Sequence, residues 1–498
     1  MTQLLAQVTF TAPVIDWWAA APFLTPLFGA LVILLLSRLS PREVPYSVST
    51  IFTVLTGVLM AGFVIRLWGE FGDHGPRVVL GGAILLDGFA IFVMLLCSLV
   101  VIVAALFVED FAPRVGLAGH EMYALILSSA VGAMVMGSAA EFITFFVGLE
   151  TLSLGLYVLA AMNLRRAASQ EASMKYFLLG AFASAVLLYG IALVYGATGT
   201  TNLIEIAEFL GSTLILKDAL LLSGIAMILV GLAFKVSAAP FHMWAPDAYQ
   251  GAPTPLAGYM AAMAKIGGFA AMARILTMAF GSEADVWQPA VAVLATLSLL
   301  VGAYLAIVQS DVKRMLAYSS IAHAGFILVA VQTNTVEGTS AVLFYIFTYA
   351  FMVLGSFGIL SLISGDDDKA TTIEDLAGLA KRRPALAFGF AMLLMSQAGV
   401  PLTAGFVAKF QAIQAAVSSE TYWLAIVAML SAVVAAYLYL RIIGAMYMSE
   451  GRSDAEVSAI SATGIAAVVV VVLITIGLGI VPGPLVDFAD DALLLVVP

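Results

Sequence analysis

About fourteen long apolar runs, separated by short polar breaks, constrain this chain more than any other feature. A run of roughly 18 to 25 apolar residues is long enough to cross the hydrocarbon core of a bilayer as a helix. The expected spans are 18–37, 48–68, 84–108, 122–138, 141–161, 175–197, 219–239, 255–279, 287–308, 314–333, 339–363, 384–412, 421–440 and 459–481. We therefore predict an all-α polytopic membrane protein and expect no strands.

Composition supports this prediction. Of 498 residues, 62% are hydrophobic and only 10% are charged, whereas a soluble domain is about 25% charged. Because this small number of charges cannot cover a water-facing surface of this size, a soluble protein is excluded.

Several function classes are also excluded. The net charge of -10 disfavours nucleic acid as a partner. The single cysteine, Cys97, cannot form a disulfide or hold an iron-sulfur cluster, and the four histidines show no metal-ligand spacing. The sequence contains no phosphate-binding or dinucleotide-binding glycine motif. We therefore expect no cofactor and no metal on this chain.

The distribution of basic residues predicts the orientation in the membrane. Fourteen lysines and arginines are expected at one side: Arg38, Arg42, Arg114, Arg165, Arg166, Lys175, Lys313, Arg314, Lys369, Lys381, Arg382, Arg383, Arg441 and Arg452. Four are expected at the other side: Arg66, Arg77, Lys217 and Arg274. By the positive-inside rule both termini lie outside. The first residues contain no basic stretch, so no removable signal peptide is expected.

Five ionisable residues fall within the apolar spans: Glu150, Lys235, Lys265, His323 and Lys409. A charge at mid-membrane costs about 2.5 to 3.5 kcal/mol even on the mildest scale, so such residues face protein or water and are candidates for function. Buried lysine and glutamate can load and release protons when their surroundings change. This set favours a proton relay, although structural ion pairs and snorkelling lysines remain open as alternatives.

Two spans carry helix breakers beside a buried lysine. Pro240 follows Lys235, whereas Pro401 and Gly405 precede Lys409. We expect both helices to be discontinuous, with freed backbone groups lining a hydrated cavity. The mirrored order predicts two inverted five-helix repeats.

The expected domains follow from these repeats. They are an N-terminal three-helix segment (1–121), a first repeat (122–285), a second repeat (286–450) and a C-terminal span with its tail (451–498).

Two further charged features have open interpretations. Glu171 and Lys175 are spaced as a local helix pair, and could also mark the inner mouth of a proton path. The acidic run 366–368 is expected to be a solvated loop or a contact for a partner.

Several segments resemble the antiporter-like proton-translocating subunits of respiratory complex I and of multi-subunit cation/proton antiporters. They are FFVGLETLSLGLYVL, ASMKYFLLGAFASAVLLYG, GLAFKVSAAPFHMWAPDAYQGAPTP, MAKIGGF, QSDVKRMLAYSSIAHAGFILVA and GVPLTAGFVAKF. In having lysine at both 265 and 409, the sequence resembles one bacterial branch of the family. The chain is too short for the lateral helix of another branch.

The resemblance implies roles for individual residues. Glu150 would tune Lys235 through their separation, Lys265 would connect the polar axis, and Lys409 would lead toward the outer side. His323 would be an auxiliary relay group.

The resemblance also implies an assembly. The partners would be other membrane-arm subunits, with the lipid bilayer around them and protons as cargo. NADH, FMN, iron-sulfur clusters and quinone would be bound by those subunits, in a bacterial cytoplasmic membrane. The alternative is a subunit of a sodium or potassium/proton antiporter.

Overall fold

The computed structural model describes residues 15–39, 44–117, 119–212, 219–365, 367–450, 460–492 and 494–495. The expectation about a signal peptide, and those for Arg42, Lys217, Asp366 and Arg452, fall outside these residues.

The described residues form a helical bundle. The longer helices are α1 (Trp17–Leu39), α2 (Tyr46–His74), α3 (Gly88–Val115), α4 (Glu121–Ser138), α5 (Phe142–Ala160), α6 (Ala167–Thr198), α8 (Ala219–Lys235), α10 (Thr254–Ala273), α11 (Ala284–Ile307), α12 (Val312–Gln332), α13 (Val336–Ile363), α16 (Pro384–Ala398), α17 (Ala404–Ser418), α18 (Tyr422–Met448) and α19 (Ala462–Ile480). Short helices are α7 (Leu203–Ser212), α9 (Trp244–Gly251), α14 (Ile373–Leu376), α15 (Leu379–Arg382) and α20 (Gly483–Asp491), with one π-helix, η2 (Arg274–Ala279), and the 3-10 turns η1 (Leu80–Gly82) and η3 (Gly281–Glu283).

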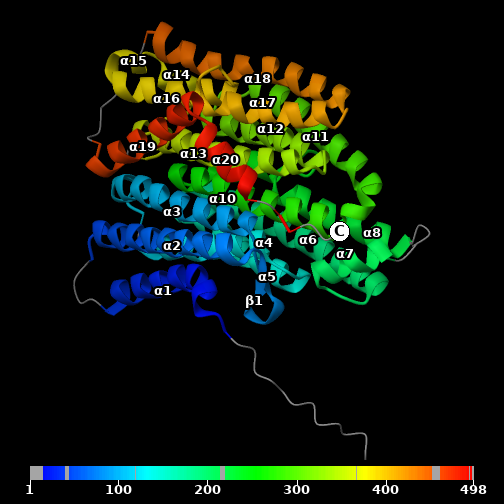
Figure 1. Ribbon diagram of the computed structural model, residues 1–498. Helices are drawn as coiled ribbons and strands as arrows, with labels where there is room; N and C mark the ends of the chain where they lie inside the picture. Colours follow the sequence, from blue (N-terminus) through cyan, green and yellow to red (C-terminus); the bar gives the residue numbers. More distant parts are fainter. Residues whose placement is uncertain are drawn as a thin grey trace, which may run out of the picture.

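The predicted spans are confirmed as helices. Within the described residues, 12 helices are long and apolar enough to cross a membrane, and α8 and α16 are shorter apolar helices. The helices lie side by side in one bundle, with α1 at one side and α18 at the other (Figure 1).

Three helices form the centre of this bundle. Every residue of α10 is buried, as is every residue of α12 except Arg314. Helix α13 packs against both of them and is buried along most of its length. A helix that is apolar all round reaches this degree of burial only when other helices surround it. The polar side chains of these three helices therefore face protein rather than lipid.

The expectation of no strands was wrong at one place. Strands β1 (Arg77–Val79) and β2 (Ile84–Leu86) form an antiparallel hairpin in which Arg77 pairs with Leu86. The turn uses Gly81 and Gly82, both at positive φ, where a side chain is disfavoured. The Asp87 side chain then caps α3 by accepting from the Ala90 amide, so the helix begins at residue 88 and not at 84.

Both predicted helix breaks are confirmed. The first separates α8 from α9 at residues 236–243, and the second separates α16 from α17 at residues 399–403. Pro240 and Pro401 lie within these breaks.

Gly405 does not lie in the second break. It belongs to the first turn of α17, and a Cβ there would come within 1.9 Å of the Ser396 carbonyl oxygen. The glycine is required by close contact between two backbones rather than by a bend.

Arg274, which was expected on the outward side, is buried in the structure. It lies in η2, and both its side chain and that of Asp87 are only 1% exposed. The guanidinium donates to both Asp87 carboxylate oxygens, at 2.9 and 2.7 Å, and to the Gly137 carbonyl oxygen. A buried arginine held in this way is a bidentate structural ion pair.

Candidate functional site

Lys235 is the last residue of α8, directly before the first break. Its side chain is buried, and its Nζ donates to Ser153 Oγ of α5 at 2.8 Å. A cavity of about 10 Å³ lies beside it, lined also by Tyr157, Tyr176 and Gly180. This volume is enough for about one water molecule. The Lys235 ammonium is therefore enclosed, with one side-chain acceptor and room for a water.

Glu150 lies one helical turn before Ser153 on α5. It is partly buried, and within the described part of the chain its Oε1 has no hydrogen-bond partner. Among the described side chains no ion pair joins Glu150 to Lys235, and Lys235 instead donates to the neighbouring Ser153 hydroxyl. An unpaired buried carboxylate oxygen is costly and remains available for water or a proton.

Lys265 of α10 reaches the first break from the neighbouring helix. Its Nζ donates to the Val236 carbonyl oxygen and to Ser237 Oγ, directly after the end of α8. Ser237 has φ 50, a left-handed conformation that few non-glycine residues adopt. Lys265 thus holds the carboxyl end of a half-helix, where a positive charge is stabilised by the helix dipole.

Lys409 makes the equivalent contact at the second break. Its Nζ donates to the Gln397 and Ala398 carbonyl oxygens at 2.8 and 2.9 Å, at the carboxyl end of α16. It also lies over the Phe326 ring, 4.9 Å from the centroid. Gly399 ends α16 with φ 88, and its missing side chain leaves room for Lys409. Two buried lysines therefore hold the carboxyl ends of two half-helices.

His323 belongs to a chain of hydrogen bonds that leads toward Lys409. Its Nδ1 pairs with the Tyr345 hydroxyl at 2.8 Å, and its Nε2 with the Tyr439 hydroxyl at 3.3 Å. Tyr439 pairs with Ser319 Oγ at 2.6 Å, and Ser319 reaches Gln397 Oε1 at 3.3 Å. The backbone oxygen of that glutamine accepts from Lys409. The hydroxyl and imidazole groups of this series can hand on protons, whereas Gln397 joins it to Lys409 only through two acceptor oxygens, so water is needed to complete that link.

The predicted residues thus fall into two clusters. Lys235 and Lys265 meet at the first break, and His323 and Lys409 are linked near the second. Within the described ranges no direct hydrogen bond joins one cluster to the other. Transfer between the clusters therefore requires water or a change of conformation.

Glu171 and Lys175 lie at the surface. Lys175 pairs with Glu171 at 2.7 Å and with Asp247 of α9 at 3.0 Å. Asp247 also pairs with Arg314 of α12 at 2.7 Å, and Arg314 donates to Gln250. The expected local pair is therefore part of a larger network that fastens α9 to α6 and α12.

Asp368 was expected in a solvated loop, and this was wrong. Its side chain is 1% exposed and accepts from Thr254 Oγ1 at 2.5 Å. Lys313 and Arg166 both lie 3.5 Å from its Oδ2. These partners belong to α10, to α12 and to the residue that caps α6. Because these segments are far apart in the sequence, the sequence alone does not show that they meet around Asp368. Asp367 beside it is exposed and pairs with Lys369.

Sequence reasoning missed several polar residues near the candidate lysines. Ser153 follows Glu150 by three residues, the spacing of one helix face, and this signal could have found it. Asp247 lies in the quoted motif APDAYQGAPTP, yet was given no role. Tyr345 and Tyr439 gave no local signal, because aromatic residues in apolar helices are normally packing residues.

This architecture defines a class of protein. A polytopic helical bundle with two broken helices, each with a buried lysine at the break, is an antiporter-like membrane subunit. Residues 139–435 match the family described as NADH:quinone oxidoreductase/Mrp antiporter, transmembrane. The chain belongs to this family, in the branch of NADH-quinone oxidoreductase subunit N.

The relatives support this branch. NADH-quinone oxidoreductase subunit N of Trichlorobacter lovleyi is 40% identical over 89% of this chain and 90% of its own length. A chain of respiratory complex I from Thermus thermophilus with bound Aureothin is 32% identical, with a TM-score of 0.79, and the match covers 94% of this chain and 99% of that one.

A chain of the Mrp complex from Dietzia sp. DQ12-45-1b shares the fold. The TM-score is 0.85 at 20% identity, and the match covers 96% of this chain and 97% of that one. The description of the matching family names both NADH:quinone oxidoreductase and the Mrp antiporter. This chain is a membrane subunit of an enzyme complex of the first kind.

Proposed function

We propose that this chain moves protons through Glu150, Lys235, Lys265, His323 and Lys409, driven by electron transfer in other subunits of an NADH-quinone oxidoreductase. The relatives named subunit N support the assembly. In this proposal NADH, FMN, the iron-sulfur clusters and quinone are bound by the partner subunits. Both termini lie on the periplasmic side of a bacterial cytoplasmic membrane.

The observation that carries the proposal is the placement of the lysines. Lys265 and Lys409 each donate to carbonyl oxygens at or just beyond the carboxyl end of a half-helix, and Lys235 ends one of those half-helices. A movement of either half-helix changes the acceptors around these ammonium groups, and with them the free energy of holding a proton there. Broken helices are the places where membrane transporters locate such sites.

The relay needs an external source of free energy. Moving one charge against 100 mV costs about 2.3 kcal/mol, and no redox group is expected on this chain. We propose that the two repeats, 122–285 and 286–450, transmit the driving motion. Each contains one broken helix with a buried lysine beside the break, Lys235 before the first break and Lys409 after the second.

The first test is Lys235→Met in the assembled complex. We expect coupled NADH-to-quinone turnover and proton uptake to fall together by about tenfold or more. Without the lysine that accepts it, a proton at mid-membrane has a free-energy cost of about 2.5 to 3.5 kcal/mol. Both rates are measured in the same vesicles, after assembly has been verified.

The matched control is Lys369→Met, because Lys369 is 72% exposed and pairs only with Asp367 among the described groups. It should leave both rates unchanged. If the Lys235 variant assembles and pumps normally, the lysine relay is wrong. Sodium or potassium counterflow in the wild-type vesicles would instead support the antiporter alternative.

A further inference from the structure

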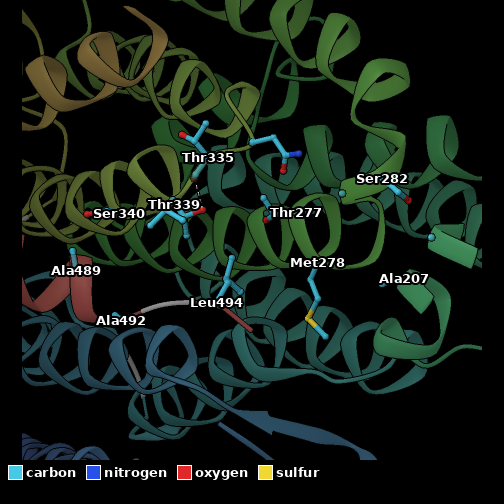
Figure 2. Close-up of a pocket in the computed structure, with 14 residues that line it drawn as sticks. Ala207, Thr277, Met278, Ser282, Thr335, Thr339, Ser340, Ala489, Ala492 and Leu494 are labelled. Atoms are coloured by element: carbon cyan, nitrogen blue, oxygen red, sulfur yellow. Dashed lines mark hydrogen bonds between the residues drawn. The ribbon is translucent and has the colours of Figure 1, made fainter. Parts of the chain in front are cut away.

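A large cavity lies at the end of the bundle opposite the basic residues Lys313 and Arg314. It has a volume of about 380 Å³ and lies where α7, η2, the turn between α12 and α13, and the tail after α20 meet (Figure 2). Its polar lining includes Thr277, Asn334 and Thr339. At about 30 Å³ per molecule, this volume holds roughly a dozen waters.

A smaller cavity continues inward from this one. Its lining shares Thr277, Asn334, Thr335 and Thr339 with the large cavity and adds Ala273, Leu276, Ala330, Val331 and Val342. These residues belong to α10 with η2, α12 and α13, the three central helices. The smaller cavity, of about 10 Å³, has room for about one water and adjoins the large one through these shared residues. Together they mark a narrow path from the end of the bundle toward its centre.

This path lies on the helix faces that carry the central polar residues. Ala330 follows His323 by seven residues, Val342 precedes Tyr349 by seven, and Ala273 follows Lys265 by eight. Residues at these spacings share one face of a helix. At 1.5 Å per residue, the inner cavity ends roughly 10 to 12 Å from the level of Lys265 and His323.

An apolar layer fills the interval between the cavity and these residues. Phe269 lies one turn after Lys265, Phe326 one turn after His323, and Ile346 one turn before Tyr349. All three side chains are at most 1% exposed, and Phe326 stacks on Tyr345 with ring centroids 6.3 Å apart. A layer of this kind closes a water path because water leaves an apolar constriction.

The wall of the cavity is held in place at η2. This π-helix contributes Thr277 and Met278 to the lining, while Arg274 of the same turn is fixed by its buried ion pair with Asp87. Asp87 also accepts from the Leu495 amide, beside the lining residue Leu494. Single π turns inside helices occur frequently at functional sites.

We propose that this cavity is an outward water vestibule that serves Lys265 and His323, and that Phe269, Phe326 and Ile346 form its gate. Protons cross the gate when water briefly enters the apolar layer. This proposal rests on the proposed function and adds a route to the outer aqueous phase at the junction between the repeats. The gate residue Phe326 also contacts Lys409.

The test uses cysteine labelling in the assembled complex. Cys97, buried in α3, is first changed to Ala, which leaves no other cysteine on this chain. Thr339→Cys then reports on the vestibule, Ile327→Cys on a fully buried position of α12 next to Phe326 in the sequence, and Asp73→Cys on an exposed position at the end of α2. The probe is a charged, membrane-impermeant methanethiosulfonate, applied from the outer or the inner side.

We expect Thr339→Cys to react only from the outer side, about tenfold or more faster than Ile327→Cys, since a thiol in apolar packing forms little thiolate. Modification should lower protons translocated per electron by about twofold or more by filling the water path. Modification of Asp73→Cys should leave this ratio unchanged.

Two results would overturn the vestibule. One is a Thr339→Cys that does not react from the outer side, and the other is full modification with unchanged proton translocation. If Lys235→Met still abolishes pumping in the same preparation, either result removes the vestibule alone and leaves the proposed function standing.

Discussion

At the residue scale, the acceptor of each buried lysine distinguishes its role. Lys235 donates to a side chain, Ser153 Oγ, and Lys409 donates to backbone carbonyl oxygens at the end of a half-helix. Lys265 donates both to the Val236 carbonyl oxygen and to Ser237 Oγ. A side-chain hydroxyl can rotate away without moving a helix, but a backbone oxygen moves only with its helix. We infer that Lys235 responds to local changes and that the other two respond to movements of α8 and α16.

Ser153→Ala tests the local role of the hydroxyl. A hydrogen bond to a charged group contributes about 1.5 to 3 kcal/mol, so its loss should change coupled turnover by roughly tenfold or more while assembly is kept. Thr151→Ala, at a partly exposed position of the same helix, should have no effect. Equal turnover in the two variants would show that Ser153 is unimportant to Lys235.

Gly405→Ala tests the close contact between α16 and α17. The added methyl group would meet the Ser396 carbonyl oxygen, so the half-helices must separate, at a cost of about 1 to 3 kcal/mol. We expect the assembled complex to lose thermal stability. Gly444→Ala, where a Cβ meets open space, is the control; an equal loss there would contradict the steric argument.

At the scale of the element, several hydrogen bonds from distant residues hold the short helix α9 in place. Lys313 donates to the Ala252 carbonyl oxygen at its carboxyl end, and Arg314 holds Asp247 and Gln250 along its length. At the other end Trp244 donates to the Phe234 carbonyl oxygen of α8, which bridges the break. Two neighbouring basic residues of α12 thus set the position of the half-helix beyond Lys235.

Arg314→Gln should loosen α9. The loss of charge-assisted bonds worth about 1.5 to 3 kcal/mol predicts backbone amide exchange in residues 244–251 that is faster by about tenfold or more. Lys381→Gln, in α15, should leave this exchange unchanged. Unaltered protection of α9 in the Arg314 variant would show that packing alone holds the helix.

At the scale of the whole molecule, Asp368 joins segments from both predicted repeats. Arg166 and Thr254 belong to 122–285, and Lys313 and Asp368 to 286–450. Because all these groups meet around one carboxylate that is buried, removing its charge leaves the cations without compensation. The two predicted repeats are therefore held together by electrostatics around Asp368 as well as by apolar packing.

Asp368→Asn should destabilise the subunit by about 3 to 5 kcal/mol, the usual cost of breaking a buried ion pair. The measurement is the temperature at which the purified complex loses this subunit. Asp367→Asn, in the same loop but 59% exposed, should shift it little. Similar midpoints for the two variants would contradict a structural role for Asp368.

The fold and the breaks could be predicted from the sequence because their causes are local. Apolar length decides whether a helix spans the membrane, and proline removes a backbone donor wherever it stands. The buried lysines were visible for the same reason, since a charge in an apolar run stands out. The hairpin at Arg77–Leu86 was missed because three-residue strands carry too little pattern to be recognised.

The sequence by itself therefore determined the membrane class, the order of the helices, the two breaks and the candidate lysines. Only the tertiary structure decided which group each lysine contacts, that Asp368 and Arg274 are buried, and that a cavity opens between α10, α12 and α13. The physical reason is that burial, ion pairing and cavities depend on which helix faces meet, and helices far apart in the sequence meet through packing that no local pattern records.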